Sequence, residues 1–208
     1  MLRYELRDYN PETARELAAA CELSPTIAQV LLNRGISDPE QARDWLNPTL
    51  AGLTAPDAMA DREAAADRLA RAVRARERIA VFGDYDVDGT TSTAVMSEIL
   101  ERLGAQVSVL VANRFEGGYG LTDEALDRVL EQRPSLLVAC DCGSSDHARI
   151  ERARAAGVDA VVVDHHLVAP EPLPAVAFVN PHRPDCGFPY KGLASVGLVL
   201  SLGAAVRR

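Results

Sequence analysis

The sequence predicts an α/β fold in which a mostly parallel, Rossmann-like sheet is flanked by helices and preceded by a small helical segment. Short apolar runs lie at residues 79–82, 107–111, 136–140 and 160–163, and segments of helical pattern lie between them near 90–103, 122–132 and 145–156. This alternation is typical of parallel sheets, in which helices connect successive strands. Asp or His residues follow three of the four apolar runs. In parallel sheets, ligands bind beyond the carboxyl ends of the strands, so these residues are the first candidates for a site.

Residues 1 to about 75 are predicted to form a helical N-terminal segment. Ser24-Pro25 and Asp38-Pro39 each place a capping side chain before a proline, which favours the start of a helix. A third helix, rich in alanine and arginine, is expected over roughly 59–75. We therefore expect a packing module over 1–75 and the main domain over 76–208.

The composition is that of a globular protein that remains in water. The chain has 208 residues, of which 48% are hydrophobic, and its formal net charge is -8. That charge argues against loose electrostatic attachment to nucleic acid or to an anionic membrane, although a bound metal ion would reverse its sign locally. The four cysteines show no CxxC spacing, and we find no signal peptide or membrane span. We expect a cytoplasmic protein with reduced thiols.

Three carboxylates follow the first apolar run at alternate positions. Asp84, Asp86 and Asp88 stand two residues apart, and Gly89 then opens a helical segment. Side chains at alternate positions of an extended chain share one face, so the three carboxylates can converge. Convergent carboxylates repel one another unless a cation lies among them, and a hard divalent cation with oxygen ligands suits such a set.

Two known motifs begin in a similar way but do not fit. The pattern Asp84-x-Asp86-x-Asp88-Gly89 matches the first half of an EF-hand loop, but the glutamate needed at its twelfth position is replaced by Val95. The run from Asp86 to Thr90 also resembles the first motif of haloacid-dehalogenase-type phosphatases. Those enzymes need a further lysine and a later acidic pair, and the only lysine here is Lys191.

The next strand ends add ligands of the same chemistry. Asp141 follows the apolar run 136–140, and Asp164-His165-His166 follows the run 160–163. An Asp141 standing alone would be a helix cap or a buried, hydrogen-bonded carboxylate. Adjacent histidines at a strand end are uncommon, and a neighbouring carboxylate can orient an imidazole for metal binding. Together with the first cluster, these residues favour a metal centre.

With these three clusters in view, the chain resembles the DHH phosphoesterase superfamily. Its first three motifs are matched by Asp84-Tyr85-Asp86-Val87-Asp88-Gly89, by Asp141-Cys142-Gly143 and by Asp164-His165-His166. Within the superfamily the chain is most similar to the RecJ-type exonucleases. This likeness extends to the glycine-rich loop 113–121 and to residues 180–186, so it covers nearly the whole chain.

The resemblance implies a metal-dependent exonuclease that uses two Mn²⁺ or Mg²⁺ ions to release nucleotides from the 5′ end of single-stranded DNA. It implies that Asp88 and His165 hold one metal, that Asp86 holds the other and that Asp141 bridges the two. It also implies that His166 contacts the scissile phosphate or supports the site. Auxiliary ligand roles are implied for two further carboxylates, Asp84 and Asp164.

A substrate surface is expected at the same edge of the predicted sheet, and the resemblance also implies partners. Arg114 is expected to clamp a phosphate and Tyr119 to stack on a base, although a solvated arginine and a packed tyrosine are open alternatives. The expected partner is single-stranded DNA, with a single-strand-binding protein or a helicase in the full-length context. No membrane partner is expected, and the chain is expected to be a monomer that serves DNA repair and recombination.

The RecJ-type pattern continues beyond the point at which this chain stops. Members of that family carry a fourth aspartate motif and further domains that grip the strand. We therefore expect a DHH core truncated at its C-terminal end, with one metal ligand missing and weak activity by itself. Two alternatives stay open: a DHH phosphodiesterase that acts on short oligonucleotides or cyclic dinucleotides, and a non-catalytic fragment that binds nucleic acid.

Overall fold

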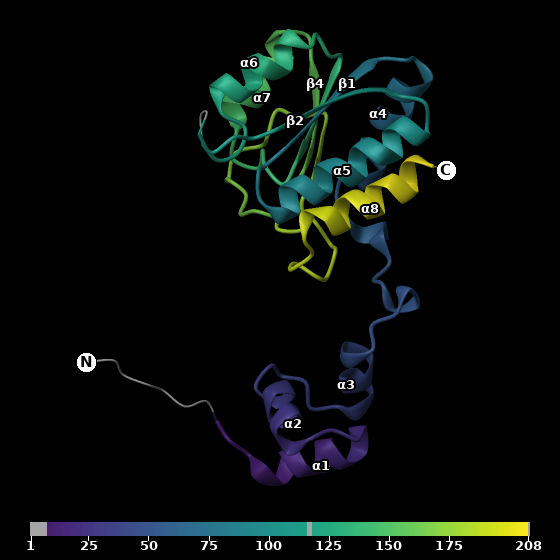
Figure 1. The fold of residues 1–208 in the computed structure, drawn as a ribbon, viewed down its shortest axis with the longest axis vertical. Helices are drawn as coiled ribbons and strands as arrows, with labels where there is room; N and C mark the ends of the chain where they lie inside the picture. The colour runs from purple at the N-terminus through teal and green to yellow at the C-terminus, as the bar shows by residue number, and fades with distance from the viewer. Residues whose placement is uncertain (1–7, 116–117, 208) are drawn as a thin grey trace, which may run out of the picture. The chain divides into compact units, whose positions relative to one another are not determined.

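The chain forms two compact units. The computed structural model describes residues 8–115 and 118–207. The chain divides into the units Met1–Thr54 and Ala55–Arg208, and Figure 1 colours them in chain order. The sequence expectations for residues 1–7, and for Glu116 and Gly117 in the glycine-rich loop, lie outside the described residues.

The first unit is a small helical module. Its helices are α1 (Pro11–Cys21), α2 (Pro25–Leu32) and α3 (Pro39–Leu46), followed by a 3₁₀ turn at Leu50–Gly52. The residues before the three helices are Asn10, Ser24 and Asp38, and the side chain of each accepts a hydrogen bond from the backbone amide three residues on. Helix α1 is not predicted as a separate element, although its Asn-Pro start carries the same signal. Leu17 and Leu31 are buried where the helices meet.

The second unit is a five-stranded sheet with helices on both faces. In chain order its elements are a 3₁₀ turn at Pro56–Ala58, α4 (Arg62–Arg74), β1 (Arg78–Gly83), α5 (Val87–Arg102), β2 (Gln106–Val111), α6 (Asp123–Glu131), β3 (Leu136–Cys140), α7 (His147–Ala155), β4 (Asp159–Val163), β5 (Ala177–Val179) and α8 (Ser195–Val206). The strands are ordered β2-β1-β3-β4-β5, and every neighbouring pair is parallel. The predicted fold class is confirmed. The chain reverses its direction of winding between β1 and β3, which is where ligands bind in sheets of this order.

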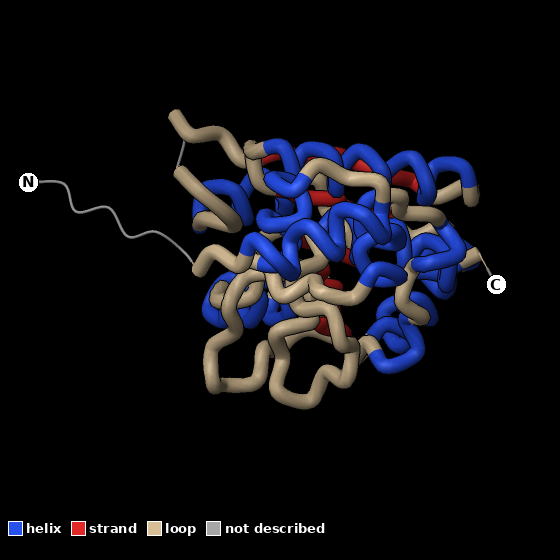
Figure 2. Tube along the Cα trace, turned by 90° about the horizontal axis from the view of Figure 1, so that it is seen from below, coloured by secondary structure: helices blue, strands red, loops and turns tan. Residues whose placement is uncertain are grey.

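Alternate side chains of each strand pack into two separate hydrophobic cores, one on each face of the sheet. Ile79 and Val81 of β1 pack with α4, α5 and α8, whereas Ala80 and Phe82 pack with α6 and α7. Figure 2 shows the strands (red) largely hidden behind helices (blue). Because both faces are covered, the strands are apolar almost throughout, and this explains why they stand out in the sequence.

Helix α4 belongs to the sheet unit. Arg68 Nε lies 2.7 Å from Asp159 Oδ2 at the start of β4, and Arg62 donates a 2.8 Å hydrogen bond to the backbone oxygen of Ser201 in α8. The unit boundary therefore falls between residues 54 and 55 rather than after 75. The expected boundary is placed too late because the apolar face of α4 packs against the sheet.

Within residues 8–115 and 118–207, no helix has the length and apolar character needed to cross a bilayer.

All four cysteines carry free thiols. Burial raises the pKa of Cys140 and of Cys142 far above the usual range. These two thiols are therefore held in the protonated, unreactive form.

The connection from β1 to α5 is exceptionally tight. A Cβ atom on Gly89 would lie 2.5 Å from the backbone oxygen of Asp84, and one on Gly83 would lie 2.8 Å from the backbone oxygen of Gly89. Both obstacles are main-chain atoms, which cannot rotate away. Glycine is thus required at residues 83 and 89 for the first helical turn to approach the strand end closely.

We expect Gly89→Ala to lower the free energy of unfolding of the sheet unit by about 2 kcal/mol or more, because the added methyl group overlaps backbone. Gly187→Ala is the matched control, since a Cβ at Gly187 meets no atom closer than 3.4 Å. Urea denaturation followed by circular dichroism measures both changes. Equal stability of the two variants would contradict the steric account of this turn.

Candidate metal centre

Four buried polar residues stand side by side where the strands end. Asp84, Asp141, Asp164 and Asn180 are the first residues after β1, β3, β4 and β5, and each is at most 1% exposed. The last residues of these strands pair directly, Gly83 with Cys140, Cys140 with Val163 and Val163 with Val179. The strand register therefore sets three carboxylates and an amide in a row at one edge.

Both carboxylate oxygens of Asp164 have hydrogen-bond partners, and Asp164 fixes the orientation of the His166 ring. Its Oδ1 accepts hydrogen bonds from the amides of His165 (2.7 Å) and His166 (3.2 Å) and lies 2.7 Å from His166 Nδ1, and its Oδ2 accepts one from the amide of Ser144 (3.1 Å). Burial acts to raise the pKa of Asp164, but the hydrogen bonds from His166 and Ser144 outweigh it and lower that pKa. The hydrogen bond to Asp164 raises the pKa of His166 to about 9.

Asn180 joins the same network from β5. Its Nδ2 donates to Ser144 Oγ (2.8 Å) and to the backbone oxygen of His166 (2.9 Å). Its Oδ1 accepts a 2.8 Å hydrogen bond from the amide of His182. The segment from Asp164 to His166 is therefore held from both sides, by Ser144 and by Asn180.

Asp141 lacks a full set of hydrogen-bond partners. Its Oδ1 accepts a 2.9 Å hydrogen bond from Ser195 Oγ and lies 3.4 Å from His165 Nε2, while its buried Oδ2 has no hydrogen-bond partner. Its backbone has a φ of 59°, a left-handed conformation that is strained for most residues other than glycine. Burial raises the pKa of Asp141 to about 7, helped by the charges of Asp88, Asp86 and Asp164 and opposed by the Ser195 hydrogen bond.

Asp88 reaches the same place from the first turn of α5. Its Oδ2 accepts a 2.8 Å hydrogen bond from the amide of Ser195, and its Oδ1 accepts a 2.9 Å hydrogen bond from the amide of Val196. Its Oδ2 also lies 3.6 Å from His165 Nε2. The structure thus brings Asp88, Asp141 and His165 together, as the sequence predicts.

The other two aspartates of the first motif have different surroundings. Asp84 Oδ1 accepts hydrogen bonds from the amides of Tyr85 (2.8 Å) and Gly120 (3.4 Å), and its buried Oδ2 has no partner. Asp86 is exposed and caps α5, where its Oδ1 accepts a 2.9 Å hydrogen bond from the amide of Gly89. The carboxylates that lie near His165 are those of Asp88 and Asp141, so the predicted ligand roles of Asp84 and Asp86 rest on the sequence.

Aromatic side chains and an arginine border the site. Arg114 lies over the ring of Tyr85, with 4.9 Å between Cζ and the ring centroid, and Tyr85 meets Tyr119 edge-on at 6.0 Å. The Tyr119 hydroxyl lies 2.9 Å from His166 Nε2. Burial and the charges of nearby carboxylates raise the pKa of Tyr119 above its usual range. Arg114 and Tyr119 therefore form one wall with His166, with Tyr85 between Arg114 and Tyr119.

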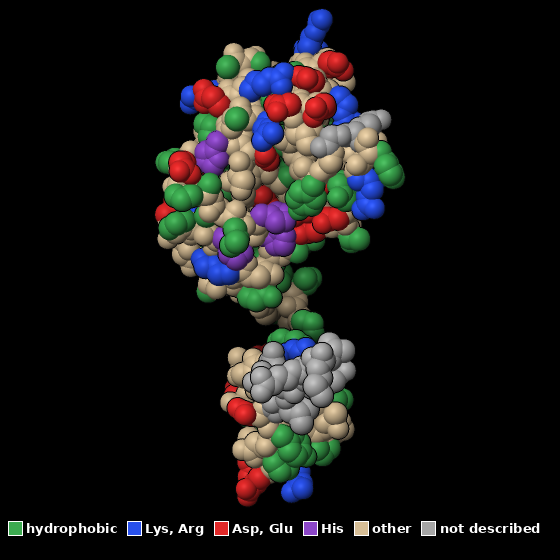
Figure 3. All heavy atoms as spheres, turned by 90° about the vertical axis from the view of Figure 1, so that its left-hand side faces the viewer, with side chains coloured by type: hydrophobic (Ala, Val, Ile, Leu, Met, Phe, Trp, Pro, Cys, Tyr) green, Lys and Arg blue, Asp and Glu red, His purple; other side chains and the backbone are tan. Residues whose placement is uncertain are grey.

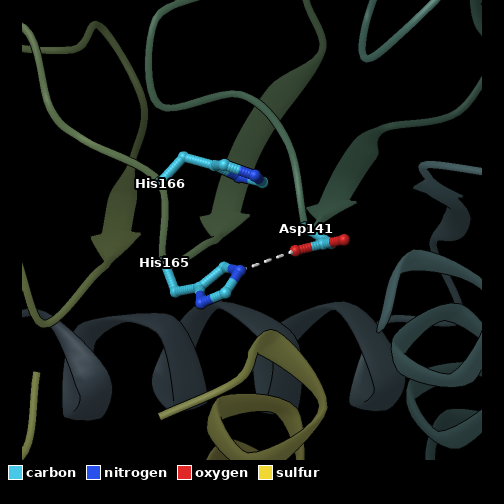
Figure 4. A group of neighbouring side chains, drawn as sticks. All are labelled: Asp141, His165 and His166. Atoms are coloured by element: carbon cyan, nitrogen blue, oxygen red, sulfur yellow. Dashed lines mark ion pairs between the residues drawn. The ribbon is translucent and has the colours of Figure 1, made fainter. Parts of the chain in front are cut away.

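Ligand atoms converge at this edge. One ligand atom each from Asp141, His165 and His166 can be chosen so that all lie within 4.8 Å of one another. Figure 4 shows the three side chains turned toward a common space, and Figure 3 shows histidine side chains (purple) beside acidic ones (red) at the surface. The unpaired oxygens of Asp84 and Asp141 need an electropositive partner. Carboxylate and imidazole ligands together suit Mn²⁺, and carboxylates and water suit Mg²⁺, so the residues fit such ions.

Comparison with known proteins agrees with this geometry. The N-terminal domain of the DHH family matches residues 78–207. The chain belongs to the DHH family. It is 35% identical over 206 residues to the single-stranded-DNA-specific exonuclease RecJ of Bacillus subtilis, and 37% identical over 205 residues to that of Escherichia coli. These alignments cover 99% and 98% of this chain but 26% and 34% of the relatives, so the chain spans about a quarter to a third of their length.

Solved structures of DHH proteins share the fold. The structure of RecJ in complex with Mn²⁺ from Thermus thermophilus aligns with 97% of this chain and 28% of its own, with a TM-score of 0.71 and 30% identity. A second, exonuclease RecJ bound to manganese, aligns with 74% of this chain and 39% of its own, with a TM-score of 0.68 and 32% identity. The Rossmann-like arrangement of the DHH domain is therefore shared with these proteins.

Sequence reasoning missed two residues of this DHH site. Ser195 contacts Asp88 and Asp141, and Asn180 holds the loop of His166. Asn180 is the first residue after β5, so the strand-end rule that selected the aspartates also applies to it. Ser195 follows no strand, and only the packing of α8 reveals its role. His166, predicted to contact phosphate, also belongs to the group of atoms that can hold a metal ion.

The raised pKa of Asp141 makes stability of the metal-free chain depend on pH. The ordinary pKa of this carboxyl is 3.8, and burial in the folded chain raises the pKa to about 7. The folded state therefore loses stability as the pH rises between these two values, and the loss is complete above about pH 7. We expect the melting temperature of Asp141→Asn, relative to the unaltered chain in EDTA, to rise from pH 4 to pH 7 and then to stay level. A difference that is constant with pH would show that Asp141 is not buried as described.

Proposed function

We propose that this chain forms the metal-binding core of a nuclease that hydrolyses phosphodiester bonds in single-stranded DNA and releases nucleotides from the 5′ end. The observation that carries the proposal is the buried Oδ2 of Asp141, which has no hydrogen-bond partner and stands beside His165 and Asp88. An unpaired carboxylate oxygen in that position is costly unless a cation binds it. Relatives over almost the whole chain are named single-stranded-DNA-specific exonucleases.

The proposed ligands are divided between two Mn²⁺ or Mg²⁺ ions. Asp88 and His165 would hold one, Asp86 would hold the other, with Asp84 as an auxiliary ligand, and Asp141 would be shared between them. Ions held there would supply Lewis acidity, which activates water and neutralises negative charge on a phosphate. No side-chain nucleophile is then required.

The remaining site residues act on the substrate. Asp164 fixes the His166 ring through Nδ1, which leaves Nε2 beside the Tyr119 hydroxyl and able to contact a phosphate oxygen instead. Arg114 brings a guanidinium to the same wall and can bind a neighbouring phosphate, and Tyr119, which is 54% exposed, can stack on a base. These contacts would hold the strand at the site.

The wider biological setting is part of the same proposal. It comprises DNA repair and recombination in the cytoplasm, by a monomer that works beside a single-strand-binding protein or a helicase. The support for this setting is the likeness to RecJ-type exonucleases rather than any contact in the structure.

We expect Asp141→Ala to lower Mn²⁺-dependent digestion of 5′-ended single strands by about 100-fold or more, because a metal ligand is lost. The assay compares a long 5′-labelled strand with a dinucleotide, using the 208-residue chain and this variant. Equal activity of the two proteins would refute the role of Asp141. Cleavage of the dinucleotide alone would favour a phosphodiesterase for short substrates, and binding of DNA without cleavage would favour a non-catalytic binding protein.

We expect Arg114→Ala to weaken binding of single-stranded DNA about threefold to tenfold and to reduce the slope of log affinity against log salt by about 0.7, as for one lost phosphate contact. The control is Arg154→Ala, which removes an exposed arginine that is already paired with Glu151. Fluorescence anisotropy in Ca²⁺, without turnover, measures both. An equal loss in the two variants would indicate a general charge effect and not a contact made by Arg114.

A further inference from the structure

The N-terminus of α8 is capped by a carboxylate from another part of the chain. The residue before the helix is Ala194, whose side chain cannot accept a hydrogen bond. The first two helical amides, of Ser195 and Val196, donate instead to the two oxygens of Asp88, at 2.8 and 2.9 Å. The partial positive charge of a helix N-terminus thus faces this carboxylate.

Ser195 contacts a second carboxylate through its side chain. Its hydroxyl donates a 2.9 Å hydrogen bond to Asp141 Oδ1, and the residue is fully buried. Its amide and its hydroxyl therefore bind residues that follow β1 and β3, the two strands at which the winding reverses.

These contacts leave room for a cation. A carboxylate oxygen offers about two acceptor positions. Asp88 Oδ2 accepts one hydrogen bond, from the amide of Ser195, and keeps one position free, whereas Oδ1 accepts from the amide of Val196 and, at 3.4 Å, from Ser92 Oγ. Asp141 Oδ2 has no hydrogen-bond partner. The donors come from the side of α8 and draw the two carboxylates toward each other despite their like charges. They fix the positions of the ligand oxygens without occupying all of their lone pairs, as hydrogen-bonded partners around metal sites do.

We propose that Ser195 is a positioning residue that holds Asp88 and Asp141 in the arrangement that binds a divalent cation, before the cation arrives. The inference rests on the proposed metal-dependent function and adds to it a residue outside the three acidic and histidine motifs. Ser195 acts on metal affinity, because the two carboxylates need no rearrangement when the ion binds. The N-terminus of α8 and the Ser195 hydroxyl already offset the repulsion between the carboxylates before the ion is present.

The test is a pair of substitutions read by Mn²⁺ binding. Ser195→Ala removes only the hydroxyl, and Ser195→Pro also removes the amide donor while suiting the first position of a helix. Ala194 has a ψ of 154°, which is compatible with a following proline. We expect the dissociation constant for Mn²⁺, measured by calorimetry and by the paramagnetic resonance of free Mn²⁺, to rise about tenfold in Ser195→Ala and further in Ser195→Pro.

Ser201→Ala is the matched control. Ser201 lies on the same helix, and its hydroxyl accepts a 3.0 Å hydrogen bond from Arg62 Nε, so its loss should leave Mn²⁺ affinity unchanged. Melting in EDTA shows that each variant is folded. If the unaltered chain and Ser195→Ala bind Mn²⁺ equally, the role of Ser195 is refuted and the proposed function stands. If the unaltered chain binds no Mn²⁺, both proposals fall.

Discussion

The row of carboxylates at the ends of β1, β3 and β4 is the constraint on which the rest of the sheet unit depends. Strand register places Asp84, Asp141 and Asp164 next to one another, and all three are buried. Burying one charge costs several kcal/mol and like neighbours add to it, so the fold must supply donors at this edge. The tight turn at Gly83 and Gly89, the loop that carries Ser144 and the start of α8 all deliver donors there or approach it closely.

The buried carboxylates receive unequal numbers of hydrogen-bond donors. This difference distinguishes the carboxylate that supports the structure from the one that is left to bind a ligand. Asp164 receives donors at both oxygens and a histidine partner, so its pKa falls and it serves to orient His166. Asp141 receives one strong donor at a strained backbone position, so its pKa rises and one oxygen is left unpaired. A buried carboxylate with an unpaired oxygen lowers the stability of the fold unless a cation binds that oxygen. Asp141, and not Asp164, is therefore the residue that serves ligand binding at the expense of stability.

The sequence predicts the parts of this arrangement that depend on local periodicity. Apolar runs reveal the strands because both faces of the sheet are covered, and the position directly after each run locates Asp84, Asp141 and Asp164. The place of α4 is predicted less well, because its docking on β4 depends on Arg68 and Asp159, which are 91 residues apart. The role of Ser195 is not predictable for the same reason, since it meets Asp88 across 107 residues and no local pattern records that contact.

The dependence on α8 has a consequence for how the centre forms. Asp88 and Asp141 follow the first and third strands, yet the donors that draw them together come from a helix near the end of the described chain. Until α8 docks on α5 and α4, the two carboxylates face each other with fewer donors and repel. A cation that binds before that step must also bring the two carboxylates together, whereas binding after it needs no rearrangement. Metal affinity and the docking of α8 are therefore coupled thermodynamically, and each must strengthen the other by the same free energy.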